Sequence, residues 1–130
     1  MQGLAHIGVF VADAEASRRY YTEKLGFEDG IRYQMDGDDG PVEIRFVSQG
    51  SLVVEFVQDG GAYAEANAAS PNHIAIACKD IDAQIAALRE KGVEFETEKP
   101  IDLMDFGANG CRFIMFRGPD GERLELQEML

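Results

Sequence analysis

The feature that most constrains the fold is an internal repeat. Residues 4–13 (LAHIGVFVAD) and residues 71–80 (PNHIAIACKD) are both short apolar segments, with a histidine near the start and an aspartate at the end. His6 is separated from His73 by the same length of chain that separates Asp13 from Asp80. A repeat of this kind indicates two copies of one supersecondary unit.

Each copy continues in the same order after its aspartate. Apolar side chains recur at helical spacing, Asp13 caps the first predicted helix and either Asp80 or Asp82 the second, and Gly26 and Gly92 follow. We expect three strands after each helix, at residues 27–35, 41–49 and 51–58 in the first copy and 93–100, 111–118 and 122–129 in the second. The sequence therefore predicts an α+β fold of two βαβββ modules in tandem: module 1 at about 1–58, a linker at 59–70, and module 2 at about 71–130.

Both histidines are predicted to lie on the sheet face away from the helix. Side chains alternate between the two faces of a strand. The residues predicted to face the helix are Ile7, Val9 and Val11 in the first copy and Ile74, Ile76 and Cys78 in the second. His6 and His73 then lie on the opposite face, next to the small residues Gly8 and Ala75.

The last strand of each copy adds a glutamate to that face. Glu55 alternates with apolar residues in LVVEF, and Glu125 does the same in LELQ. Glu55 follows His6 at nearly the same separation as Glu125 follows His73. A carboxylate in such a strand is costly to bury unless it is paired or bound to a metal. We therefore expect His6, Glu55, His73 and Glu125 to bind one divalent ion (Zn²⁺, Ni²⁺, Co²⁺ or Mn²⁺) between the curved sheets.

Composition limits the partners and the compartment. Lys plus Arg is 12 and Asp plus Glu is 24, which gives a formal net charge of −12. Nucleic acid and anionic membranes would repel such a surface, so we expect neither as a partner. No basic, apolar leader begins the chain, so a cytoplasmic location is expected. The two cysteines, Cys78 and Cys111, are interpreted as buried apolar filler.

The chain resembles the vicinal-oxygen-chelate superfamily, which includes glyoxalase I, methylmalonyl-CoA epimerase, extradiol dioxygenases and bleomycin-resistance proteins. The resemblance rests on LAHIGVFVAD with YYTEKLGF, LVVEF, NHIAIACKDID and PDGERLEL, and covers essentially the whole chain as one glyoxalase-like domain. The His/Glu/His/Glu set is most similar to small bacterial glyoxalase I (lactoylglutathione lyase). That likeness implies a homodimer that binds Ni²⁺ or Zn²⁺ and isomerises the hemithioacetal of methylglyoxal and glutathione through an enediolate, with Glu125 as the base and Glu55 as a possible partner.

Two positions depart from the glyoxalase I pattern and leave the substrate open. Phe10 stands where an arginine is usual, and Asp59 where an asparagine is usual, and both positions help to bind glutathione in that branch. Lys99, Arg45 and Arg112 are candidate cations for an anionic substrate. One alternative is another metal-dependent isomerase or epimerase with a non-glutathione substrate, although the epimerase branch usually has glutamine at position 55. Another is a non-catalytic protein that binds a small molecule such as an antibiotic. Residues 101–110 are a candidate lid.

Overall fold

A computed structural model describes residues 1–60, 71–117 and 123–130. Contacts divide the chain into two compact units. We call residues His6–Asn72 the N-terminal module, and Met1–Ala5 with His73–Leu130 the C-terminal module. Residues 61–70, which make up most of the predicted linker, and residues 118–122 lie outside the described residues.

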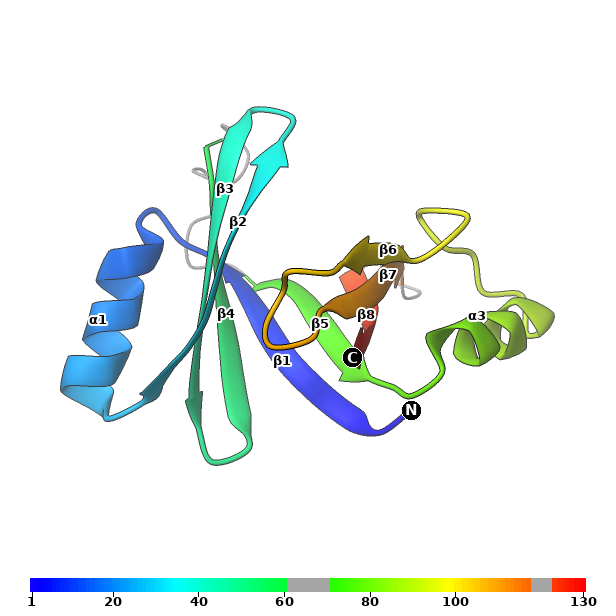
Figure 1. Ribbon diagram of the computed structural model, residues 1–130, viewed down its shortest axis with the longest axis horizontal. Helices are drawn as coiled ribbons and strands as arrows, with labels where there is room; N and C mark the ends of the chain where they lie inside the picture. Colours follow the sequence, from blue (N-terminus) through cyan, green and yellow to red (C-terminus); the bar gives the residue numbers. More distant parts are fainter. Residues whose placement is uncertain (61–70, 118–122) are drawn as a thin grey trace. The chain divides into compact units, whose positions relative to one another are not determined.

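The N-terminal module contains β1 (Gly3–Phe10, with its first three residues in the other unit), α1 (Ala14–Leu25), β2 (Glu28–Gly37), β3 (Gly40–Gln49) and β4 (Leu52–Asp59). Its strand order is β2-β3-β4-β1, with β1 parallel to β4 and the other pairs antiparallel. Helix α1 covers one face of this sheet (Figure 1). The predicted βαβββ order is confirmed here.

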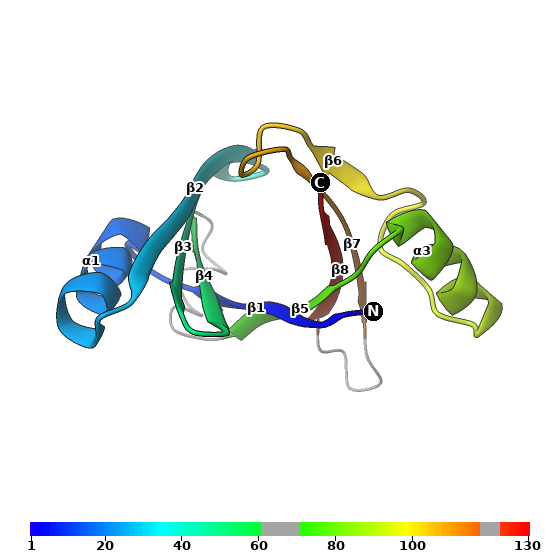
Figure 2. The same ribbon diagram turned by 60° about the horizontal axis from the view of Figure 1, so that its bottom comes forward.

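The C-terminal module repeats the arrangement with β5 (Pro71–Ala77, with its first two residues in the other unit), α3 (Ile81–Glu90), β6 (Ile101–Leu103), β7 (Cys111–Arg117) and β8 (Arg123–Met129). Its strand order is β5-β8-β7-β6, with β5 parallel to β8. Helix α3 lies on one side of β7 and β8 (Figure 2). The mixed sheets and the α+β class therefore agree with the prediction in both modules.

The helices begin and end where the sequence indicates. The side chain of Asp13 accepts a hydrogen bond from Ala16 N, and that of Asp80 accepts one from Ala83 N. Gly26 closes α1 in the left-handed conformation at φ 74°. This region favours glycine because glycine has no Cβ. Gly92 follows α3 with φ 84°.

Each helix covers its own apolar core. In the N-terminal module this cluster contains Ala14, Val47, Val54 and Phe56, with Val9, Val11, Tyr21 and Phe27 packed against it. In the C-terminal module it contains Cys78, Ile81, Ile85, Ile114, Phe116 and Leu126, with Ile76 packed against it. Val9, Val11, Ile76 and Cys78 therefore face the helices as predicted, whereas Ile74 stays 43% exposed outside the core. Cys78 and Cys111 are buried free thiols, and burial raises the pKa of Cys78.

The strand predicted at residues 93–100 is wrong. In that stretch Phe95 makes an isolated bridge to Phe116, and the chain then turns. The hydroxyl of Thr97 donates to the Lys99 carbonyl, which stabilises a turn in place of a strand ladder. The strand β6 begins at Ile101 instead, inside the segment predicted as a loop.

The rest of that segment, residues 104–110, forms a compact turn. Phe106 is buried, and its backbone carbonyl accepts a hydrogen bond from Gly110 N. Gly110 has φ 96°, and a Cβ there would come within 3.0 Å of the Leu103 carbonyl oxygen. The turn therefore requires glycine at this position. Its role as a lid stays a prediction.

Candidate functional site: two buried histidine–glutamate pairs

The first pair lies in the N-terminal module. His6 is on β1 and Glu55 on β4, and their side chains face away from the α1 core. His6 Nε2 lies 3.3 Å from Glu55 Oε2. The two residues are only 2% and 6% exposed. A buried carboxylate is thus brought next to an imidazole nitrogen by two parallel strands.

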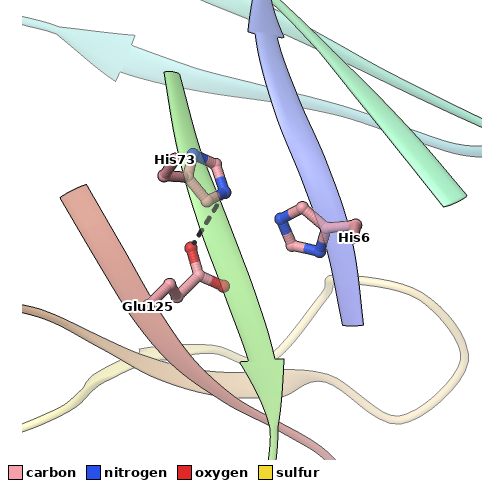
Figure 3. Close-up of side chains that lie close together, drawn as sticks. All are labelled: His6, His73 and Glu125. Carbon is pink, nitrogen blue, oxygen red and sulfur yellow. Dashed lines mark ion pairs between the residues drawn. The ribbon is translucent and has the colours of Figure 1, made fainter. Parts of the chain in front are cut away.

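The second pair repeats this arrangement in the C-terminal module. His73 on β5 and Glu125 on β8 are each 5% exposed. His73 Nε2 lies 3.3 Å from Glu125 Oε2 (Figure 3). The two modules therefore hold the same pair of side chains at the same separation, as the aligned repeat predicts.

Small residues lie beside each glutamate. Gly8 is the register partner of Glu55 across β1 and β4, and Ala75 is the partner of Glu125 across β5 and β8. Both small residues are buried. Neighbouring residues at the same level of a parallel pair share a face, so a large side chain here would compete for the space around the carboxylate.

Bulkier neighbours lie on the next strand. Phe46 on β3 is the register partner of Glu55, and its ring meets the His6 ring edge-on, with centroids 5.1 Å apart. Met115 on β7 is the register partner of Glu125. These register positions place an aromatic side chain beside Glu55 and a thioether side chain beside Glu125.

The strand that carries each glutamate also anchors a helix. Beyond Glu55 on β4, Gln58 Oε1 accepts a hydrogen bond of 2.8 Å from Ala14 N at the start of α1. At the same offset beyond Glu125 on β8, Glu128 accepts bonds of 2.7 and 3.2 Å from the backbone N–H groups of Asp80 and Ile81. These contacts were not predicted from the sequence. The signal was a polar residue on the helix-facing side at the same offset in both copies.

Two of the three suggested cations lie on the wrong side of their sheets. Arg45 forms ion pairs with Glu15 of α1 and with Asp29, on the helix-facing side of β3. Arg112 is on the helix-facing side of β7. It is bound by Asp82 and Asp102, and its hydrogen bonds to them raise its pKa. Lys99 is exposed in the turn before β6.

A model of the Glyoxalase/Bleomycin resistance protein/Dioxygenase superfamily matches residues 3–126, so the chain belongs to that superfamily. The resemblance to the vicinal-oxygen-chelate superfamily is thereby confirmed. The uncharacterized Bacillus subtilis (strain 168) protein YwkD is 30% identical to the chain over 131 residues, with 98% of each covered. The uncharacterized YwbC of the same strain is 28% identical, with 92% of each covered.

Solved structures with the same fold include two methylmalonyl-CoA epimerases. The Mycobacterium tuberculosis enzyme has a TM-score of 0.78 and 21% identity, and the alignment covers 98% of this chain and 88% of that one. The Streptomyces coelicolor enzyme (E43Q), in complex with 2-nitronate-propionyl-CoA, has a TM-score of 0.78 and 22% identity, with 98% and 97% covered. At these identities the likeness shows the fold alone. Neither helix in the described part of the chain has the length and apolarity needed to cross a bilayer.

Proposed function

We propose that this protein is a metal-dependent isomerase or epimerase that moves a proton next to a substrate carbonyl through an enolate. The observation that carries the proposal is the duplicated, buried His–Glu pair, with Nε2 and Oε2 3.3 Å apart in each module. Burial of two carboxylates is unfavourable unless each gains a compensating charge. A bound cation supplies that charge.

The donor set fits a divalent ion. His6, Glu55, His73 and Glu125 offer two imidazole nitrogens and two carboxylate oxygens, ligands that suit Zn²⁺, Ni²⁺, Co²⁺ or Mn²⁺. The modules that complete one site belong either to one chain or to two chains of a homodimer. When bound, the ion polarises the substrate oxygens and favours the negative charge that develops on them.

The side chains of the protein then carry the proton. We assign the role of general base to Glu125, which takes a proton from the carbon beside the carbonyl and returns it to the substrate. Glu55 is the equivalent carboxylate of the other module and serves as its partner. Phe46 and Met115, the register partners of the two glutamates, keep water from the reacting carbon.

The N-terminal module argues against glutathione as the thiol. Asp59 lies on the same face of β4 as Glu55, because the two residues are an even number of positions apart in one strand. The arginines of β2 and β3, Arg32 and Arg45, are register partners and lie on the opposite, helix-facing side. The two carboxylates of glutathione would therefore meet an acidic group on this face in place of a basic one, which favours a different substrate.

Two alternatives to this isomerase or epimerase predict different experimental results. A glyoxalase I-like lyase is favoured by Glu55, which gives the full His/Glu/His/Glu set, and it would form lactoylglutathione. A non-catalytic binder would hold a small molecule without needing the four donors. The solved structures named as methylmalonyl-CoA epimerases make methylmalonyl-CoA a natural first substrate to test.

The test is metal analysis of untagged protein, followed by assays with Zn²⁺ or Ni²⁺ added. We expect about one ion per pair of modules, and metal-dependent exchange of a substrate C–H proton with D₂O, followed by NMR. Epimerisation of methylmalonyl-CoA and formation of lactoylglutathione are assayed in parallel to identify the branch. Protein that binds no divalent ion, and exchanges no proton in any assay, would contradict the proposal and favour the binder.

A further inference from the structure

Two arginines lie on the same sheet face as Glu125. In the antiparallel register of β7 and β8, Met115 is opposite Glu125, and Arg117 is opposite Arg123. Residues opposite one another share a face, and so does every second residue along a strand. Arg117 and Arg123 are therefore on the Glu125 face, two positions from it, a distance of about 7 Å along the strand.

His73 belongs to the same row as these arginines. The parallel register of β5 and β8 pairs Ile74 with Leu124, so that His73, one position earlier, lies beside Arg123. A row made of His73, Arg123 and Arg117 thus runs across three strands, next to the row that contains Glu125. Basic side chains border the His–Glu pair of this module on one side.

A carboxylate already bridges the two guanidinium groups. Glu96 Oε1 lies 2.9 Å from Arg117 Nε, and Glu96 Oε2 lies 3.0 Å from Arg123 Nη2. Burial opposes ionisation of Glu96, but the hydrogen bond from Arg123 and the charges of both arginines outweigh it and lower its pKa.

The arginine side chains remain accessible to a ligand. Those of Arg117 and Arg123 are 56% and 35% exposed. Arg123 Nε is nevertheless buried and has no hydrogen-bond partner in the described part of the chain. The equivalent row of the N-terminal module contains Ser48 opposite Val53, both uncharged. The basic row is therefore a property of one module only, in a chain whose formal net charge is −12.

We propose that Arg117 and Arg123 bind a carboxylate of the substrate beside the His73–Glu125 pair. This inference rests on the proposed function and names its substrate class: a small 2-oxo or acyl compound with a second carboxylate a few bonds from the carbon that loses its proton. Guanidinium groups suit this role because their planar N–H donors match the two oxygens of a carboxylate.

The experiment compares two substrates with the same 2-oxo acid group. 2-Oxoglutarate has a distal carboxylate where 2-oxopentanoate has a methyl group. Exchange of the C3 protons with D₂O is followed by NMR on metal-loaded protein. We expect kcat/KM to be at least tenfold higher for 2-oxoglutarate. Arg123→Gln should remove this preference by raising KM for 2-oxoglutarate at least tenfold, with kcat for that substrate changed by less than threefold. The kcat/KM for 2-oxopentanoate should change by less than twofold.

The matched control is Arg32→Gln, which removes the same charge from an exposed arginine on the helix-facing side of the other module. Arg32→Gln should change kcat/KM for each of the two substrates by less than twofold. Arg117→Gln tests the same prediction at the other arginine, in case Arg123→Gln folds poorly. Equal exchange of the two substrates by the unaltered protein, or an equal loss of both on Arg123→Gln, would overturn the inference.

Failure of the proposed function has a different signature. If metal-loaded protein exchanges neither substrate, calorimetric titration with the same two compounds still decides the role of the arginines. At least tenfold tighter binding of 2-oxoglutarate, lost on Arg123→Gln and kept on Arg32→Gln, supports the carboxylate site. Equal affinities for the two compounds overturn it.

Discussion

The two modules place the same pair of donors in different surroundings. His6 and Glu55 in one, and His73 and Glu125 in the other, are equally close and almost equally buried. Their rows of neighbours differ: Val53 and Ser48 in the first module correspond to Arg123 and Arg117 in the second. The comparison teaches that strand register holds the donors in place, whereas the neighbouring rows are free to diverge. On the two proposals above, metal binding and substrate choice would be carried by different residues of the same strands.

Replacing each glutamate with glutamine should give the largest difference between the modules. If Glu125 is the base, Glu125→Gln lowers kcat for proton exchange by about 10³-fold, within the usual range for the loss of an acid–base group. Glu55→Gln changes a proposed ligand but leaves the base in place, and should therefore lower kcat much less than Glu125→Gln does. The measurement is the C–H exchange rate, normalised to bound metal. Equal losses in the two variants would refute the division of roles.

Removing the side chain that bonds to the start of each helix, Gln58 or Glu128, should give a smaller difference, in the free energy of unfolding. Glu128 accepts two backbone N–H groups at the start of α3, and its negative charge suits a helix N-terminus. Glu128→Ala should therefore cost about 2 kcal/mol, as expected for hydrogen bonds to a charged group. Gln58 is neutral and accepts one N–H group. Gln58→Ala should therefore cost only about 1 kcal/mol.

Urea unfolding measures both losses of stability. The control is Glu94→Ala, at an exposed site of the C-terminal module. Its effect should stay within about 0.5 kcal/mol, as for most surface substitutions. A larger loss for Gln58→Ala than for Glu128→Ala would contradict the expected order.

The smallest expected effect is on the pH dependence of stability, through the acidic residues in the first turns of the two helices. The hydrogen bond from Arg18 lowers the pKa of Glu15 from 4.5 to about 2, with a further contribution from the Arg45 charge. The hydrogen bond from Arg112 lowers the pKa of Asp82 in the other module. A lowered folded-state pKa stabilises the protein above the unfolded value, and this is lost as the pH falls through the folded value.

We therefore expect the contribution of Glu15 to fade between about pH 4.5 and pH 2, as the two pKa values just given require. Carboxyl NMR titration provides the measurement. Arg18→Ala should raise the pKa of Glu15 and leave that of Asp82 unchanged. Movement of both pKa values together would point to a general charge effect rather than to the local hydrogen bond.

Much of the fold follows from local sequence patterns. The alternation in residues 6–11 is enough to separate His6 from the helix-facing valines, because strand geometry leaves only two directions for side chains. Asp13 and Asp80 predict the helix starts, because N-capping depends only on the adjacent turn of the chain. The repeat alone aligns Glu55 with Glu125. The grouping of all four donors around one ion stays a prediction.

Long-range contacts could not be predicted in this way. Glu96 meets Arg117 and Arg123 only after the chain has turned following Phe95, and the apolar–polar alternation of VEFETE favoured a strand there instead. The sequence suggests Arg45 and Arg112 as cations for a substrate, but acidic residues at the starts of the helices bind them on the other side of each sheet. Charge alone does not indicate which face of a strand a side chain will occupy.

The contacts of Gln58 and Glu128 limit where residues can be inserted into β4 and β8. Glu55 and Gln58 point to opposite sides of β4, and one codon inserted between them would put both on the same side. The strand would then lose either the buried position of Glu55 or the hydrogen bond between Gln58 and the start of α1. The same applies to Glu125 and Glu128 in β8. Insertions between the glutamate and the helix contact are therefore disfavoured, whereas insertions in the connecting turns leave both contacts in place. This fits the slightly longer stretch of chain between histidine and glutamate in the second copy than in the first.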